Sequence, residues 1–180
     1  MRICRAFLAV GVLQFMSAVL VAERLYPGYS PSTHYISDLG AAAAPTAALF
    51  NISAAALGIA GVAAAFCLRR AHPRGWPLLA SASVGVVGVA LFPEDAGLPH
   101  FISAFTAFIC GAASTAVIGA EAGGVYRTLG VSLAALSTAA LSLMAAGLET
   151  PLGAGCLERL VAYPILIFYM AYGFGGEETG

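Results

Sequence analysis

The stretch that decides the fold is Thr46–Leu68, TAALFNISAAALGIAGVAAAFCL, in which no residue carries a charge. An α-helix rises about 1.5 Å per residue, so a helix of this length crosses the hydrocarbon core of a bilayer, which is about 30 Å thick. The regular apolar–polar alternation of a membrane-spanning β-strand is absent. The segment therefore predicts a transmembrane helix.

Five further apolar segments surround this one. The whole chain is 60% hydrophobic and only 9% charged, whereas about a quarter of the residues in an ordinary soluble domain are charged. No stretch between the segments is long enough for a separate soluble domain. We predict an all-α, polytopic integral membrane bundle of six transmembrane helices in a single domain, residues 1–180. The predicted spans are Ile3–Ala22, Thr46–Leu68, Trp76–Phe92, Pro99–Ala120, Thr128–Gly147 and Leu157–Tyr172, of which the third is short.

The arginines predict the orientation. The first segment is kept as a span, because the stretch before Glu23 lacks the small residue that a signal peptide carries three positions before its cleavage site. With an even number of spans both termini share a side, and cytoplasmic loops carry an excess of positive charge. We therefore expect a multi-pass protein of the cell membrane with both termini cytoplasmic. One side holds Arg2, Arg5, Arg69, Arg70, Arg74 and Arg127, and the other holds Arg24 and Arg159.

Several functional classes are not expected. The net charge of −1 provides no basic surface for nucleic acid. No nucleophile elbow, P-loop, HExxH or Rossmann motif is present. The cysteines form no CxxC pair, so we expect small apolar residues rather than disulfide or zinc ligands at Cys4, Cys67, Cys110 and Cys156.

Polar side chains gather on the predicted outer side. Six of the nine acidic residues and two of the three histidines fall there. The positive-inside rule explains arginines on the other side, but it does not require this mixture of acids, histidine and arginine. Ionisable groups near hydrocarbon are costly, and they are functional candidates by default. The set comprises Glu23, Arg24, His34, Asp38, Glu94, Asp95, His100, Glu149, Glu158 and Arg159.

The segment Tyr26–Gly40 is the richest of these polar stretches. Ser30 before a proline is typical of a helix N-cap, and Gly40 is typical of a helix end. A short helix between them would place His34 and Asp38 on one face. That spacing suits a histidine oriented by a carboxylate, or a pair of metal ligands. The structural alternative, which spacing alone favours, is a capped loop whose polar groups satisfy its own backbone.

Two further positions are candidates for catalysis. His100 opens the fourth span, where a helix N-terminus favours the neutral imidazole that serves as a general base or a ligand. An ordinary interface histidine explains the position equally well. Ser37 lies beside Asp38 and is a candidate nucleophile, which would need a base close in space.

The start of the last span carries Glu158 and Arg159, with Tyr163 one turn further on. The planar guanidinium could hold a lipid phosphate or pair with a carboxylate, while the alternative is a local ion pair or a snorkelling side chain. Asn51, inside the second span, is expected to bridge helices. The aromatic residues at 168–172 are expected to form a belt at the membrane interface.

Several of these residues form blocks that resemble a known family. The blocks resemble those of the prokaryotic domain-of-unknown-function family 998 over nearly the whole chain. The Tyr-Ile-Ser-Asp block, the following Phe and the later His are also similar to the eukaryotic DRAM family, whose wider group includes a Golgi factor that remodels the lipid of GPI anchors. The blocks are Tyr35-Ile-Ser-Asp-Leu-Gly40, Pro45 with Leu49-Phe50-Asn51, Phe92-Pro93 with Gly97 and His100, and Glu158-Arg159 with Tyr163-Pro164.

The resemblance implies six spans and one outer-face cluster, and it makes lipid a reasonable ligand by analogy. His34 lies outside the shared block. The cluster that the resemblance implies consists of Ser37, Asp38, His100, Glu158 and Arg159.

Three functional hypotheses follow. The first is an enzyme or binding protein for a membrane lipid head group, with His100 as base or ligand, Asp38 as its partner, Ser37 as nucleophile and Arg159 as phosphate clamp. In this hypothesis Glu158, His34 and Tyr163 are further ligand-binding residues. The others are a small-solute transporter and a structural or partner-binding membrane protein. The presence of a metal or cofactor, and assembly as a homo-oligomer, are left open.

Overall fold

The computed structural model describes residues 2–147 and 151–175, and within these residues all regular secondary structure is helical. Two single-turn 3₁₀ helices lie in the connections, η1 (Ser37–Gly40) and η2 (Glu94–Ala96). All six predicted spans are confirmed to within a few residues. The helices are α1 (Arg2–Leu25), α2 (Ala47–Leu68), α3 (Gly75–Leu91), α4 (Leu98–Ala122), α5 (Gly124–Ala145) and α6 (Ala154–Phe174).

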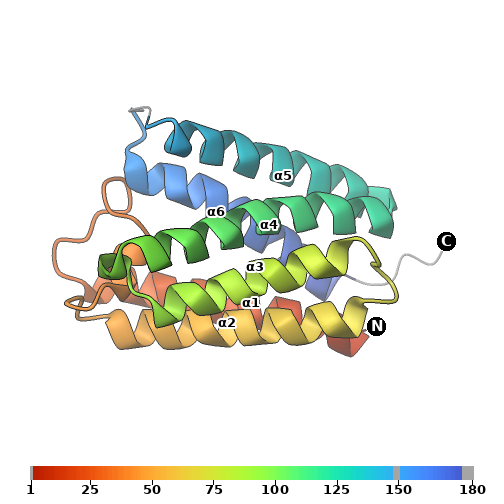
Figure 1. Ribbon diagram of the computed structural model, residues 1–180, viewed down its shortest axis with the longest axis horizontal. Coiled ribbons are helices and arrows are strands. Elements are labelled where there is room, and N and C mark those ends of the chain that lie inside the picture. Colours follow the sequence, from red (N-terminus) through yellow and green to blue (C-terminus); the bar gives the residue numbers. More distant parts are fainter. Residues whose placement is uncertain (1, 148–150, 176–180) are drawn as a thin grey trace.

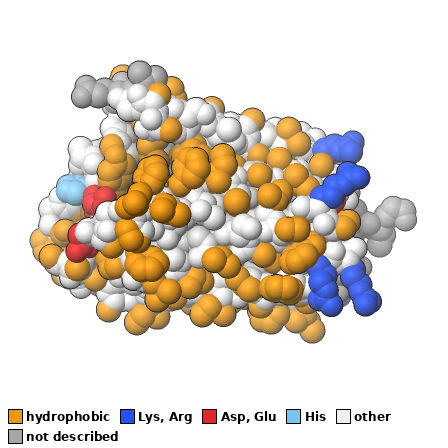
Figure 2. All heavy atoms as spheres, in the orientation of Figure 1, with side chains coloured by type: hydrophobic (Ala, Val, Ile, Leu, Met, Phe, Trp, Pro, Cys, Tyr) orange, Lys and Arg blue, Asp and Glu red, His pale blue; other side chains and the backbone are white. Residues whose placement is uncertain are grey.

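The helices have the length and surface of membrane spans. Five of the described helices are long and apolar enough to cross a membrane, and α3, with 17 residues, is the short one expected from sequence. Large apolar side chains such as Ile52, Ile59 and Phe105 are exposed on the outside of the bundle. Figure 2 shows this apolar surface between two polar ends. In lipid such a surface is solvated, whereas in water it would drive aggregation.

Helices that follow one another in sequence pack side by side, and α6 returns to α1, which closes the bundle. The short connections make neighbouring helices antiparallel, so Arg2 and Phe174 lie at the same end (Figure 1). Small residues permit close approach of the backbones. A Cβ atom added at Gly85 of α3 would lie 2.6 Å from the backbone nitrogen of Ala107 in α4. The α4–α5 crossing is similar, since a Cβ at Gly119 would lie 3.0 Å from the Cα of Gly130.

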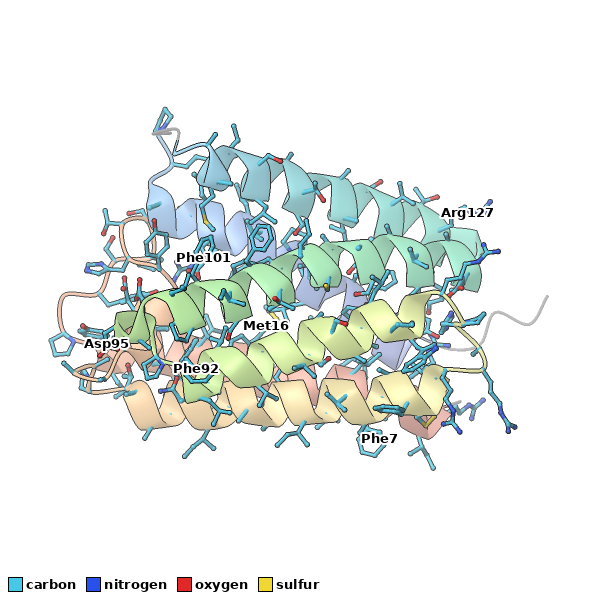
Figure 3. All side chains as sticks on the ribbon, viewed as in Figure 1. Phe7, Met16, Phe92, Asp95, Phe101 and Arg127 are labelled. Atoms are coloured by element: carbon cyan, nitrogen blue, oxygen red, sulfur yellow. A yellow bond between two sulfur atoms is a disulfide. The ribbon has the colours of Figure 1, made fainter. Side chains whose placement is uncertain are left out.

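The two ends of the bundle differ in charge. Arginines crowd one end, which we call the arginine end, and acidic side chains and a histidine lie at the other, the polar end (Figures 2 and 3). The polar end is made by residues 26–46, η2 and the connection that leads into α6, of which Glu149 lies outside the described residues. This arrangement is the one predicted from the arginine count. The exposed arginines at the arginine end are Arg2, Arg69, Arg70, Arg74 and Arg127.

The aromatic belt predicted at 168–172 is wrong. Phe168, Tyr169 and Tyr172 are buried in the centre of the bundle. Their helix, α6, packs against α1 and α5 and also touches α4, so most of its surface faces protein rather than lipid. Sequence alone does not distinguish an aromatic residue at the interface from one in the core.

The expectation for the cysteines is wrong for one pair. Cys4 and Cys67 form a disulfide, with their Cα atoms 5.6 Å apart. Because α1 and α2 are antiparallel neighbours, the first turn of one helix meets the last turn of the other. The two residues are 63 positions apart in the chain, so only the helix pairing brings them together. Cys110 and Cys156 are free and partly buried, as expected for small apolar residues.

Candidate functional site

The continuous helix predicted between Ser30 and Gly40 does not form. A single turn closes where the backbone N–H groups of Thr33 and His34 donate to the carbonyl of Ser30, and η1 follows as a separate element. The Nδ1 atom of His34 accepts the backbone N–H of Ser30 at 3.1 Å, and its ring stacks on Tyr29.

Asp38 has a different partner. Its carboxylate accepts the backbone N–H of Tyr35 at 2.8 Å. His34 and Asp38 therefore each accept a hydrogen bond from a different backbone N–H group. They do not lie on one face of a common helix, as the spacing had predicted.

Side chains of α2 fix the position of η1. Asn51 donates to the carbonyl of Gly40 at 3.0 Å, and Thr46 donates to the carbonyl of Leu39 at 2.9 Å. Gly40 has no room for a side chain, since a Cβ atom there would lie 2.4 Å from the ring of Phe50. Asn51 thus ties its helix to a loop element, rather than to another span as the sequence suggested.

Arg159 joins three parts of the polar end. Its Nη1 atom donates to the carbonyls of Pro31, His34 and Gly155 at 2.8, 3.2 and 3.0 Å. Its Nη2 atom donates to the carboxylate of Glu23 at 2.5 Å and to the hydroxyl of Tyr29 at 2.7 Å. The side chains of Arg159 and Glu23 are only 11% and 14% exposed. Arg159 therefore holds together α1, α6 and residues 26–46, the connection from α1 to α2, which we call the first loop.

Three of the predicted site residues meet at a cavity inside the bundle. The cavity, about 110 Å³ in volume, is bordered at the polar end by Ser37, His100 and Glu158. These three side chains are 8%, 9% and 7% exposed, respectively. The remaining wall is apolar and comes from five helices and from Ile36, which precedes η1. It consists of Phe15, Ile36, Phe50, Ala54, Leu57, Val86, Val89, Ala104, Ala107, Phe108, Ala162, Ile165 and Leu166.

The polar groups of the cavity are oriented by the backbone. The Nδ1–H of His100 donates to the carbonyl of Phe92 at 2.8 Å, so Nε2 is the acceptor of the neutral ring. Glu158 accepts the backbone N–H groups of Ile36 and Ser37. Among the described residues, no hydrogen bond is made by His100 Nε2 or the Ser37 hydroxyl, and no side chain donates to Glu158. These groups are available to a ligand.

The other predicted residues lie beside the cavity rather than on it. Asp38 lies next to Glu94 where η1 meets η2, and the carboxylate of Asp95 accepts the backbone N–H of Ala42 at 3.0 Å. Figure 3 shows Asp95 and Phe92 at this end of the bundle. The Tyr163 hydroxyl lies beside the Arg159 guanidinium. In the described part of the chain, no three His, Cys, Asp or Glu side chains come together to hold a metal ion.

Crowding of carboxyl groups makes this end sensitive to pH. Burial, reinforced by the neighbouring Asp38, raises the pKa of Glu94 from 4.5 to about 8. The protonated form is thus favoured by the fold, so its stabilising contribution is complete below pH 4.5 and is lost as the pH rises through 8. We expect the melting temperature in detergent to fall between pH 5 and pH 8.

Glu94→Gln mimics the protonated carboxyl and checks this expectation. The variant should match the wild type at pH 5 and melt at a higher temperature than the wild type at pH 8. Arg24→Gln, which removes an exposed charge at the same end of the bundle, should keep the wild-type pH dependence. Parallel pH profiles for Glu94→Gln and the wild type would contradict the assignment.

The comparisons with known proteins agree with the first resemblance. A family model described as "Protein of unknown function (DUF998)" matches residues 9–175. The chain belongs to the DUF998 family. The matched range takes in nearly all of the six helices and every residue that borders the cavity. No curated protein and no solved structure matches the chain. The likeness of this DUF998 protein to the DRAM family and its GPI-lipid relatives therefore stays a prediction.

Sequence reasoning missed a second polar cluster in this DUF998 protein, at the arginine end. The Nε2 atom of His72 lies 2.5 Å from the hydroxyl of Tyr172, and its Nδ1 lies 3.5 Å from the carboxylate of Glu121. Burial lowers the pKa of His72. The guanidinium of Arg5 lies 4.2 Å from the centre of the Tyr172 ring. A lone histidine in the short connection between two spans was the only signal, and the positive-inside rule had accounted for its arginine neighbours.

Proposed function

We propose that this protein binds a membrane amphiphile, with the hydrocarbon chain inside the bundle and the head group at the polar end. The observation that carries the proposal is a cavity whose wall is apolar except for three polar side chains that border it at the polar end. Its polar border consists of Ser37, His100 and Glu158, and the rest of its wall is hydrocarbon. Apolar cavities of about 150 Å³ stay dry and accept hydrophobic ligands.

A second cavity extends the apolar space toward the arginine end. It has a volume of about 70 Å³ and is bordered by Leu8, Gly58 and Tyr169 among others. The two cavities share five wall residues, so small side-chain movements would join them. The shared residues are Leu57, Val86, Ala107, Ile165 and Leu166. The walls of both cavities are almost entirely apolar, which suits a hydrocarbon segment better than a polar solute.

The roles proposed for individual residues follow from their positions. His100 presents Nε2 as a hydrogen-bond acceptor, Ser37 presents a hydroxyl, and Glu158 presents a carboxylate. Arg159 and Asp38 support this border by holding the first loop in place, and Tyr163 packs beside Arg159. The proposal therefore does not use Arg159 as a phosphate clamp, because protein acceptors already occupy both of its terminal nitrogens.

The test is to fill the cavity without changing the charge. Phenylalanine at Ala104 or Ala162, both of which border the cavity, should exclude a chain. Ala56→Phe is the matched control, since Ala56 is exposed on α2. Each protein is purified in mild detergent, and native mass spectrometry identifies what remains bound.

We expect a lipid mass on the wild type and the control, and its loss from Ala104→Phe and Ala162→Phe. The same bound masses on all four proteins, or none on the wild type, would reject the proposal. If His100→Ala has a lower melting temperature but keeps its bound lipid, the result would favour the third hypothesis, a structural or partner-binding membrane protein. Solute flux in proteoliposomes that survives cavity filling would favour a transporter with another path.

A further inference from the structure

The polar border of the cavity is made of acceptors. His100 Nε2 and the Glu158 carboxylate accept hydrogen bonds, and only the Ser37 hydroxyl can also donate one. The backbone N–H groups of Ile36 and Ser37, which could have held an anion, already donate to Glu158. A phosphate or carboxylate head group would find almost no donors here.

Negative charges outnumber positive charges around the polar border of the cavity. Asp38 and Glu94 lie close enough to Glu158 to interact with its charge. The described polar end holds two arginines, of which Arg24 is exposed and Arg159 is engaged with Glu23. The positive charge of Arg159 also acts on Glu158, but the terminal nitrogens of Arg159 donate to Glu23, Tyr29 and backbone carbonyls instead. A buried carboxylate with no direct ion pair is costly, and Glu158 is only 7% exposed. A positively charged ligand would supply the missing partner.

Resting on the proposed function, we infer that the bound amphiphile is a long-chain amine, whose ammonium group sits at Glu158, His100 and Ser37. An alkylammonium has three N–H donors and one positive charge, as the lysine side chain does. Three acceptor groups border the cavity, and a carboxylate is among them. The chain attached to the ammonium would follow the apolar wall into the bundle.

Burial is the main cause of the raised pKa of Glu94, and the carboxyl groups of Asp38, Glu158 and Asp95 add to it, so negative charge is concentrated at this end. The same charge balance disfavours anionic amphiphiles. Lipids that combine an amine with a phosphate carry both signs, and they would leave the phosphate among acceptors.

The experiment compares three ligands with the same chain: tetradecylamine, tetradecanol and tetradecanoate. Each is added at equal concentration to the full-length protein in mild detergent at neutral pH, where the amine is cationic and the acid anionic. Affinities are measured from bound fractions in native mass spectra. We expect the amine to bind about tenfold more tightly than the other two, since hydrogen bonds between charged groups are stronger than those between neutral groups.

Glu158→Gln keeps an acceptor for the N–H of Ile36 but removes the charge. It should weaken amine binding about tenfold and leave alcohol binding unchanged. Asp95→Asn, which removes an exposed charge at the same end, should leave both affinities unchanged. If Glu158→Gln fails to fold, the wild-type ranking of the three ligands still decides the question.

The outcomes separate this inference from the proposed function. Equal binding of all three ligands, or tighter binding of tetradecanoate, would overturn the amine assignment and leave chain binding standing. Binding of none of the three, together with no lipid on the purified wild type, would overturn the proposed function itself. Amine binding that survives both Glu158→Gln and Ala162→Phe would place the amine outside the cavity and also overturn the inference.

Discussion

Replacing Arg159 with methionine is expected to lower the free energy of unfolding by about 3–5 kcal/mol, because it leaves the buried carboxylate of Glu23 without a partner. The substitution also removes donors from the carbonyls of Pro31 and His34. Both residues of the ion pair are less than one-sixth exposed, with 11% for Arg159 and 14% for Glu23, so solvent does not replace the interaction. The measurement is the melting temperature in detergent, with denaturant titration for the free energy.

Arg24→Met is the matched control for this prediction. Arg24 also lies at the polar end but is exposed, and its replacement should change stability by less than about 0.5 kcal/mol. The double variant Glu23→Gln with Arg159→Met should be more stable than the sum of the single changes predicts, because the uncompensated charge is removed. Additive effects would show that the two side chains act independently and would contradict this account.

Replacing Gly155 with alanine should be nearly as destabilising. We expect it to lower the free energy of unfolding by about 3 kcal/mol or more. A Cβ atom at this position would lie 2.1 Å from the carbonyl oxygen of His34 and 2.5 Å from that of Pro31. Both are backbone atoms and cannot rotate away. The first loop would have to lift off α6, which would also displace the N–H groups of Ile36 and Ser37 from Glu158.

Gly28→Ala is the control for Gly155→Ala, because it introduces backbone strain without steric overlap. Gly28 has φ of +78°, and an added Cβ atom there would have nothing within 4 Å. Alanine should cost about 1–2 kcal/mol at this position, through the left-handed backbone alone. Both variants are compared with the wild type by melting temperature and by retained lipid. An equal decrease in melting temperature for the two variants would contradict the close docking of the first loop on α6. Retention of lipid by Gly155→Ala would contradict it as well.

These two predictions concern the part of the molecule that sequence described least well. Sequence alone could place the polar residues of this region at one end of the bundle, because polar residues in an apolar chain stand out by composition. Ser37, His100 and Glu158 were all named as candidates, and all three border the cavity. Arg159 lies at the same polar end but pairs with Glu23 and the first loop, which is the local ion pair considered from sequence as the alternative to a phosphate clamp. The rotation of a helix about its axis decides which neighbour a side chain meets.

What the sequence by itself determined is the set of spans and the polarity of the two ends. Transfer of an apolar run into lipid depends on that run alone, so Thr46–Leu68 was identified without knowledge of its partners. Tertiary structure decided the Cys4–Cys67 disulfide, the burial of Tyr172 and the separation of His34 from Asp38. Each of these depends on which helices and loops are neighbours and on how they are rotated. Every apolar face in this chain is acceptable to lipid, so hydrophobicity could not show which faces meet protein, and only the packing of the helices did.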